Sequence, residues 1–252
     1  MPNPIENLNS QRLLRPALPG GAVALSTTSD FPATHGKNFT RVAEELGKLL
    51  GGTNAEAVFA EQTHGHGIAL LDSQIAATTS DGPGWREIAN CDALATSSPG
   101  IALVVRTADC VPILVSDSSR PFIAAVHAGW RGTLERILER TLQLALDTGS
   151  RPGDLWVWMG PHIRREHYQV SPDLLADFHQ RFGHLADIGV GRQLDLTAVN
   201  TLQAETAGVP PEQIADCGLC TFARQDLYPS YRRDGECRGQ IFTGLILPPT
   251  GD

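Results

Sequence analysis

Hydrophobic residues recur at helical spacing in two long segments of the chain. The first runs from residue 37 to residue 50 and is followed by Gly51-Gly52, a pair typical of a helix end. The second runs from Gly132 to Thr148 and ends at Gly149. The apolar positions are Phe39, Val42, Ala43, Leu46, Leu49 and Leu50 in the first segment and Leu134, Ile137, Leu138, Leu142 and Ala145 in the second. Each segment therefore predicts one amphipathic helix with a buried face.

Two shorter helices are predicted from their capping residues. Ser171 precedes Pro172, which is typical of a helix start because the serine oxygen accepts a backbone N–H and proline fits the first turn. Asp195 can cap a further helix in the same way, and Gly208 marks its end.

Short apolar runs predict buried strands. IALVV from residue 101, VPILV from residue 111 and FIAAV from residue 122 have strand length and are bounded by polar or turn residues, so we expect them in a central sheet. WVWM at 156–159 and IFTGLIL at 241–247 predict two more strands. Helices and strands mix without strict alternation, which predicts the α+β fold class. Since no repeat or long linker is visible, we expect a single domain over residues 1–252.

The composition excludes several classes of protein. Hydrophobic residues are 41% and charged residues 19% of the 252 positions, which is too apolar for a disordered chain. The net charge of -8 provides no broad positive field, so we expect no nucleic-acid partner. No run reaches the roughly 18 apolar residues of a membrane span, and the first residues lack the apolar centre of a secretory signal. We therefore expect a cytoplasmic protein without a membrane partner, and the sequence leaves its oligomeric state open.

The cysteines do not form a disulfide framework. There are five, an odd number, at positions 91, 110, 217, 220 and 237 of a chain large enough to fold without disulfides. Cys217 and Cys220 have C-x-x-C spacing, but no second such pair exists, so we interpret both as ordinary thiols.

Three segments carry side chains that can bind a metal: EQTHG at 61–65, TADC at 107–110 and VHAGWR at 126–131. Cys110 lies between two predicted strands and His127 ends a third, so adjacent strands would bring a thiol and an imidazole together. Taken singly, a cysteine beside buried strands is more often packed core, and a histidine at a strand end is more often a hydrogen-bonded structural residue. Residue spacing alone leaves both interpretations open.

Several short motifs are spread across most of the chain. They are QTHG, CDALAT, TADCVPIL, AVHAGWRGT, GPHI, the Cys-Thr pair at 220–221, and YRRDG. Together they closely resemble the YfiH family, also called the multicopper polyphenol oxidase or laccase-domain family. The resemblance implies helices that flank a central pair of packed sheets, and a zinc site at the positions of His64, Cys110 and His127. One departure is the absence of the family's arginine near the N-terminus, where this chain reads STTSDFP at 26–32.

The implied ligand set suits a catalytic zinc site. Two neutral imidazoles and one thiolate leave the fourth tetrahedral position of zinc open, so His64, Cys110 and His127 are also the predicted catalytic residues. Copper is an alternative occupant because it outcompetes zinc for most nitrogen and sulfur ligands. In an extended segment His64 and His66 face the same way, and we choose His64 because it matches the family position.

Substrate contacts are predicted beside this site. His127 to Gly132 leads from a strand into a helix, whose free N–H groups and dipole favour an anion, and Arg131 can grip phosphate. Arg232 and Gln62 are further substrate-binding candidates, although a surface ion pair is an equally good interpretation of Arg232.

The resemblance implies several activities. We predict a zinc-dependent purine nucleoside phosphorylase that cleaves inosine, adenosine or methylthioadenosine with phosphate and also deaminates adenosine. The first alternative is an editing hydrolase for peptidoglycan precursors, which either depends on the metal or uses Cys110 as nucleophile and His127 as base. Copper-dependent phenol oxidation ranks lower because eight His and two Met are poor material for a multicopper cluster. A non-catalytic ligand-binding module is the last alternative.

Overall fold

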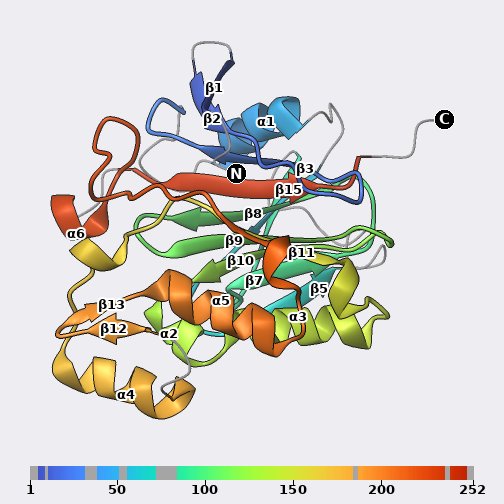
Figure 1. Ribbon diagram of the computed structural model, residues 1–252. Helices are drawn as coiled ribbons and strands as arrows, with labels where there is room; N and C mark the ends of the chain where they lie inside the picture. Colours follow the sequence, from blue (N-terminus) through green and yellow to red (C-terminus); the bar gives the residue numbers. More distant parts are fainter. Residues whose placement is uncertain are drawn as a thin grey trace.

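Two β-sheets stacked face to face form the centre of the computed structural model (Figure 1). The structure describes residues 5–8, 11–31, 39–50, 56–71, 84–183, 187–235 and 239–248. The seven-stranded sheet has the order β1 (Ile5–Leu8), β2 (Gln11–Leu14), β3 (Val23–Thr27), β15 (Ile241–Ile246), β8 (Ile101–Thr107), β4 (Glu56–Ala60), β6 (Trp85–Ile88). The six-stranded sheet has the order β14 (Ile214–Asp216), β11 (Leu155–Met159), β9 (Val111–Asp117), β10 (Ile123–Ala128), β7 (Ala93–Thr96), β5 (Ile68–Leu71). A separate hairpin pairs β12 (Gly189–Val190) with β13 (Gln193–Leu194).

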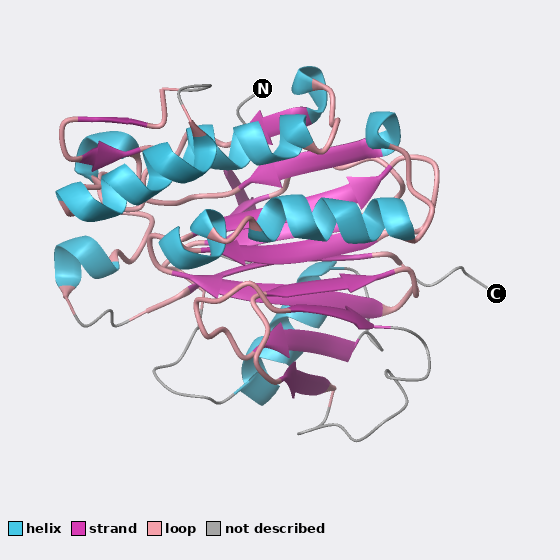
Figure 2. Cartoon of the chain, turned by 90° about the horizontal axis from the view of Figure 1, so that it is seen from below, coloured by secondary structure: helices cyan, strands magenta, loops and turns pink. Residues whose placement is uncertain are grey.

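Helices cover the outer face of each sheet. The helices are α1 (Phe39–Leu50), α2 (Trp130–Leu134), α3 (Ile137–Asp147), α4 (Pro172–Phe182), α5 (Leu196–Thr206) and α6 (Tyr231–Asp234). Helix α1 packs on the seven-stranded sheet, whereas α3, α4 and α5 pack on the six-stranded sheet, where Figure 2 shows them in front of the strands. A further cluster of apolar side chains, which includes Leu103, Leu114 and Ile123, fills the space between the two sheets. The α+β class and the central pair of sheets are therefore confirmed.

The predicted caps and the first helix are confirmed. Helix α1 begins at Phe39 and buries the predicted face, while residues 37 and 38 and Gly51-Gly52 lie outside the described residues. The Ser171 hydroxyl accepts the N–H of Leu174 at 3.2 Å. The Asp195 carboxylate accepts the N–H of Ala198 at 3.0 Å, so both side chains satisfy a backbone donor that the first helical turn leaves free.

The prediction of one helix from Gly132 to Thr148 is wrong. The segment forms α2 and α3, which are separated at Arg136, where φ is 62°. The break is stabilised from α5, because the Gln203 amide donates to the carbonyl of Thr133 at 2.9 Å and accepts the N–H of Glu139 at 3.3 Å. A buried side chain thus satisfies backbone groups that an unbroken helix would pair internally, which hydrophobic periodicity does not reveal.

The three apolar runs from residue 101 do not share one sheet. Strand β8 pairs with β4 and β15 in the seven-stranded sheet, whereas β9 and β10 pair with each other in the six-stranded sheet. The chain crosses between the sheets at residues 108–110, where Asp109 has a φ of 87°. All three runs are buried as predicted, but burial is the same in either sheet, so their apolar character could not distinguish the two arrangements.

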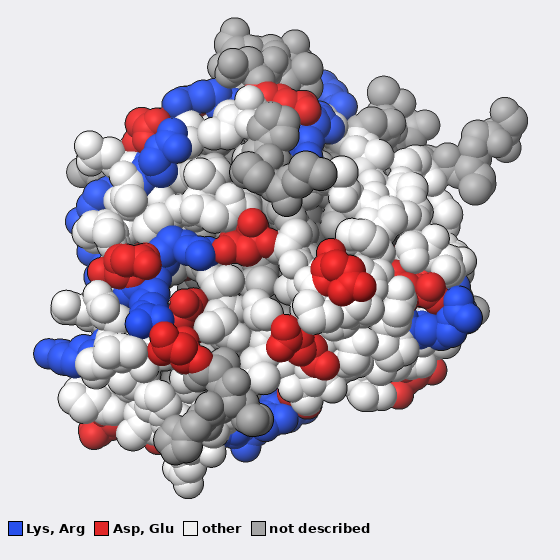
Figure 3. Space-filling model, viewed as in Figure 1, with Lys and Arg blue, Asp and Glu red and all other residues white. Residues whose placement is uncertain are grey.

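The surface agrees with the charge balance of the sequence. Figure 3 shows basic and acidic side chains interspersed over the drawn face, and its described residues form no continuous basic area. Among the residues that the structure describes, no helix has the length and apolar character needed to cross a membrane.

We expect loss of the α4 cap to lower stability. Ser171→Ala removes the acceptor for the N–H of Leu174 and should reduce the free energy of unfolding by about 1 kcal/mol in urea denaturation. Ser171→Asp supplies another good capping oxygen and serves as the control. Equal stability of the alanine and aspartate variants would contradict the capping role.

Candidate metal centre

Two strands of the six-stranded sheet and one loop bring His64, Cys110 and His127 together. Strand β10 pairs antiparallel with β9, with His127 opposite Pro112, so Cys110 lies just beyond the end of β9 and beside β10. His64 lies in the loop between β4 and β5. One potential ligand atom from each of the three side chains lies within 4.8 Å of the other two. The predicted proximity of the TADC and HAGW segments is confirmed. His64 and His66 are both exposed, but of the two only His64 belongs to this group.

A single carboxylate holds the loop that carries His64. The Asp92 side chain accepts the backbone N–H groups of Thr63, His64 and Gly65 at 3.1, 3.0 and 2.8 Å. His64 has a φ of 59°, and this left-handed conformation turns three successive N–H groups towards one anion. The loop is thereby fixed although it contains no helix or strand.

Asp92 also contacts His127. Its carboxylate lies 2.7 Å from the His127 Nδ1 atom, and its backbone carbonyl accepts the His127 N–H at 2.7 Å. Burial alone raises the pKa of Asp92, but hydrogen bonds from His127, Gly65 and Thr63 outweigh burial and lower this pKa. Asp92 is therefore a buried, ionised carboxylate.

A second buried carboxylate anchors the residue before Cys110. Asp109 accepts hydrogen bonds from the hydroxyls of Thr221 at 2.6 Å and Ser230 at 3.0 Å, and from the backbone N–H of Arg232 at 2.7 Å. Its own backbone is left-handed, an uncommon conformation for a residue other than glycine that the surrounding contacts must maintain. These contacts join α6 and the segment around Thr221 to the Cys110 turn.

Cys110 and His127 stabilise each other's charged forms. Burial alone raises the pKa of the Cys110 thiol, but the charge on His127 and hydrogen bonds from His127 and His64 lower it to about 6. Burial alone lowers the pKa of His127, whereas the Cys110 charge and the hydrogen bond with Asp92 raise it to about 9. The thiolate is the form of cysteine that binds metals and acts as a nucleophile, so this environment suits either role.

The space in front of the three side chains is kept open by Gly129. A Cβ atom at this position would lie 3.1 Å from Cys110 Sγ, 3.4 Å from His64 Cδ2 and 3.6 Å from His127 Cε1. Two imidazoles and a thiolate are also the donor types that zinc prefers. The residues present therefore fit a bound zinc ion with one open coordination position.

The three predicted substrate-binding side chains differ in whether their polar atoms already have partners within the protein. Both amide atoms of Gln62 bond the backbone of Arg106, at 2.7 and 2.8 Å. The Arg131 guanidinium is exposed and lies 4.5 Å from the centre of the Trp130 ring. The Arg232 guanidinium donates to the carbonyl of Gln169 at 2.9 Å. Gln62 thus secures the loop before His64, whereas both arginines have guanidinium donors without a partner among the described residues.

The Arg232 side chain also lies against an aromatic ring. Its guanidinium lies 5.2 Å from the centre of the Tyr168 ring. Burial raises the pKa of Tyr168, and the negative charge of Cys110 raises it further. Tyr168 therefore remains a hydrogen-bond donor at neutral pH.

The anion site at the helix after His127 stays a prediction, but that helix is shorter than expected. Helix α2 has only five residues, because the chain breaks at Arg136. The partial charge at a helix end arises from aligned peptide dipoles, and one short turn aligns few of them. Any phosphate near Arg131 would therefore be held mainly by the guanidinium and local N–H groups.

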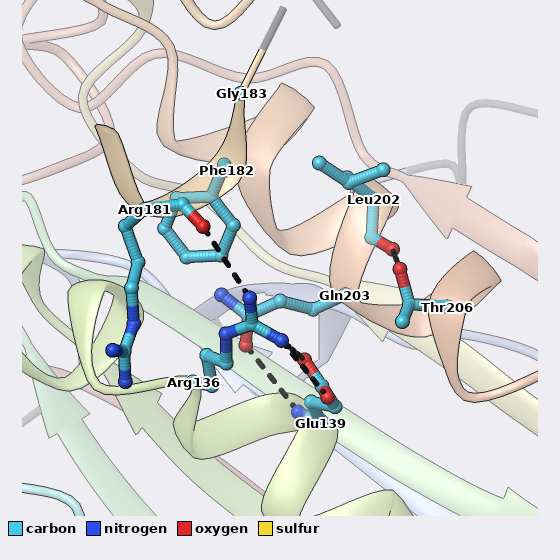
Figure 4. A pocket seen from close by; sticks show the side chains of 8 residues that line it. All are labelled: Arg136, Glu139, Arg181, Phe182, Gly183, Leu202, Gln203 and Thr206. Atoms are coloured by element: carbon cyan, nitrogen blue, oxygen red, sulfur yellow. Dashed lines mark hydrogen bonds and ion pairs between the residues drawn. The ribbon is translucent and has the colours of Figure 1, made fainter. Parts of the chain in front are cut away.

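A cavity of about 330 Å³ between α3, α4 and α5 is distinct from this centre (Figure 4). Arg136 in its wall donates to Glu139 at 3.1 Å and to the carbonyl of Arg181 at 3.3 Å, and it stacks on Phe182. These contacts hold the helix break, together with Gln203, and none of the candidate metal ligands lines the cavity.

Sequence reasoning missed Asp92 and Asp109. Both lie in motifs that carry the family resemblance, CDALAT and TADC, and both are surrounded by apolar residues. An acidic residue in a buried segment needs hydrogen-bond partners, and this was the available signal. The expectation of free thiols is confirmed for Cys91, Cys110, Cys217 and Cys220, while Cys237 lies outside the described residues.

The layered fold and the cluster of two imidazoles and a thiol define a candidate metalloenzyme. Residues 23–248 match the family described as multi-copper polyphenol oxidoreductase laccase, and the chain belongs to this family.

Relatives of the chain are named as enzymes. A purine nucleoside phosphorylase of Deinococcus radiodurans is 34% identical over 234 residues, which cover 91% of this chain and 84% of the relative. Adenosine deaminase RL5, from an unknown prokaryotic organism, is 32% identical over 206 residues, which cover 79% and 78%. The crystal structure of YlmD from Geobacillus stearothermophilus matches with a TM-score of 0.83 at 26% identity and covers 98% of this chain and 100% of its own. The family is therefore one of enzymes.

We expect a methyl group at Gly129 to reduce metal binding without unfolding the protein. The backbone at Gly129, with φ of -73° and ψ of 172°, is accessible to alanine, so Gly129→Ala should act by crowding the three side chains. Zinc titration followed by elemental analysis should show weaker binding. Gly153→Ala is the matched control because its Cβ meets nothing within 4 Å. Unchanged zinc affinity in Gly129→Ala would show that the space is not used.

Proposed function

We propose that this protein is a zinc-dependent purine nucleoside phosphorylase that cleaves inosine, adenosine or methylthioadenosine with phosphate and also deaminates adenosine. Several relatives bear the name purine nucleoside phosphorylase, and one is named adenosine deaminase. In this proposal His64, Cys110 and His127 hold the metal. When bound, zinc supplies a Lewis acid at the open face of the cluster.

The observation that carries the proposal is the absence of a carboxylate partner for the arginines beside this cluster. Most other described arginines pair with Asp or Glu, as in Arg86–Glu56 and Arg164–Asp216. Within the described chain Arg131 and Arg232 form no such pair, although the protein is acidic overall. Arg131 lies two residues after Gly129, and the Arg232 backbone is bonded to the residue before Cys110.

Unpaired guanidinium groups suit phosphate, because their planar donors match phosphate oxygens and no internal anion competes for them. Phosphorolysis requires phosphate to be positioned towards the sugar carbon, and Arg131 is our candidate for this role. Tyr168 lies against the Arg232 guanidinium, and in this proposal its phenol is a donor to the nucleoside. Deamination requires no phosphate, so the two reactions depend on different parts of the site.

A second candidate function is supported by the spatial arrangement of three side chains. Cys110, His127 and Asp92 form a thiolate, an imidazole and an orienting carboxylate, the arrangement of a metal-independent cysteine hydrolase. A peptidoglycan-precursor amide is the substrate that the family resemblance implies for such a reaction. Activity that survives complete metal removal would favour this candidate. Copper could bind the same ligands, and phenol oxidation by the copper-loaded protein is the corresponding test.

We expect metal removal to stop both purine reactions. Dialysis against a chelator should abolish phosphorolysis and deamination, and added zinc should restore them. Cys110→Ala removes the single thiolate of the cluster and should abolish stoichiometric zinc binding. Retention of one zinc equivalent by this variant would contradict the ligand assignment.

We expect Arg131→Ala to separate the two reactions. Loss of a charge-assisted contact should raise the KM for phosphate about 10- to 100-fold, while adenosine deamination is largely preserved. Arg41→Ala is the matched control, since Arg41 is an exposed arginine on α1, which packs on the other sheet. Equal loss of both reactions in Arg131→Ala would indicate a structural role. No turnover of any purine nucleoside by zinc-loaded protein would overturn the proposed function.

A further inference from the structure

Asp92 is fully buried and lies directly before β7, beside His127 of β10. We propose that Asp92 is a positioning residue that assembles His64 and His127 into a metal site, while Cys110 is positioned independently of it. This inference rests on the metal-binding part of the proposed function and not on the identity of the substrate.

The two oxygens of Asp92 divide the contacts between them. Oδ1 faces the His64 N–H at 3.0 Å and the His127 Nδ1 atom at 2.7 Å. Oδ2 accepts the N–H and hydroxyl of Thr63 at 3.1 and 3.2 Å and the Gly65 N–H at 2.8 Å. Every partner can donate, so the position requires an acceptor at both oxygens. Among side chains of this shape only an ionised aspartate meets that requirement.

These contacts fix how each histidine is presented. A proton on His127 Nδ1 is held by the carboxylate, which leaves Nε2 as the ring atom available to a metal. The His64 backbone is held in its left-handed conformation, so the direction of its side chain follows from the same anion. Asp92 therefore determines the orientation of one ligand through its ring and of the other through its backbone.

Cys110 reaches the centre by a different route. The residue before it, Asp109, is bonded to Thr221, Ser230 and Arg232, and its carbonyl accepts the N–H of Ile163 at 2.9 Å. Within the described chain, Asp92 forms no hydrogen bond with the 108–110 turn. Substitution of Asp92 should therefore weaken histidine ligation and leave thiolate ligation in place.

The charge of Asp92 also matches the proposed occupant. A divalent cation held by one thiolate and two neutral imidazoles retains one positive charge. The buried carboxylate of Asp92 would compensate this charge at hydrogen-bond distance from a ligand ring. Because the Asp92 carboxylate compensates the charge from behind a ligand ring, no anion is needed on the open face of the centre, which stays free for substrate.

Asp92→Asn tests the proposal with little change in shape. An amide has one oxygen and one NH₂ group. In either orientation the NH₂ group would face N–H groups that donate to Asp92 in the wild type, and two donors cannot form a hydrogen bond with each other. We expect zinc affinity to fall about 10- to 100-fold in a competition titration. With saturating cobalt as the probe, the thiolate-to-cobalt absorption should persist, whereas the ligand-field bands should change because a nitrogen ligand is lost or displaced.

Asp117→Asn is the matched control. Asp117 is another buried carboxylate, at the opposite end of β9, whose Oδ1 accepts the N–H groups of Ser119 and Arg120. The Asp117→Asn substitution should lower thermal stability and leave zinc affinity and the cobalt spectrum unchanged. The proposal is overturned if Asp92→Asn binds zinc like the wild type, if it loses the thiolate-to-cobalt absorption, or if Asp117→Asn weakens zinc binding equally.

A measurement on the wild type keeps the test independent of whether Asp92→Asn folds. Nitrogen-15 NMR of the zinc-loaded protein should show a proton on His127 Nδ1 and none on Nε2, and the reverse pattern would overturn the proposal. None of these measurements uses a nucleoside. Zinc binding without purine turnover would therefore refute only the proposed function, whereas purine turnover with unaltered zinc binding in Asp92→Asn would refute only the role of Asp92.

Discussion

The antiparallel pairing of β9, β10 and β7 is the constraint on which the candidate centre depends. Val126 is opposite Ala93 and Ala128 is opposite Val111, so the residues just beyond these pairs, Asp92 and Cys110, lie on either side of His127. A shift of one residue in either pairing would turn the side chains to the opposite faces of the sheet. The apolar layers on both faces oppose such a shift, because it would expose buried residues and bury polar ones.

Two buried aspartates extend this order into segments that have no regular structure. Asp92 fixes the loop around His64, and Asp109 fixes the turn before Cys110. Both segments contain a left-handed residue other than glycine, a conformation that costs free energy and persists only where neighbouring contacts determine it. The cluster is therefore rigid on the sides that hold the ligands. On its open side Gly129 contributes no side chain, which leaves room for a reacting molecule.

The chemistry available at that opening is broader than one reaction. A thiolate beside an imidazolium suits either metal binding or nucleophilic attack, and copper and zinc share a preference for these donors. The family description names a copper oxidase, while individual relatives are named as a phosphorylase and a deaminase. Our proposal of phosphate chemistry rests on a feature outside the cluster, namely Arg131 and Arg232, which have no carboxylate partner among the described residues.

The sequence by itself predicted the elements whose signals are local. Phe39 to Leu50 carries its helix in its own periodicity, Ser171 and Asp195 act on backbone groups three residues away, and apolar runs such as VPILV are buried wherever they lie. The motif resemblance also indicated which two histidines and which cysteine form the candidate site. Only the tertiary structure decided that β8 belongs to a different sheet from β9, that the helix breaks at Arg136, and that Asp92 faces two histidine segments. Each of these depends on contacts between residues far apart in the chain, such as Gln203 with Thr133 and Asp109 with Arg232, and local propensity contains no information about such partners.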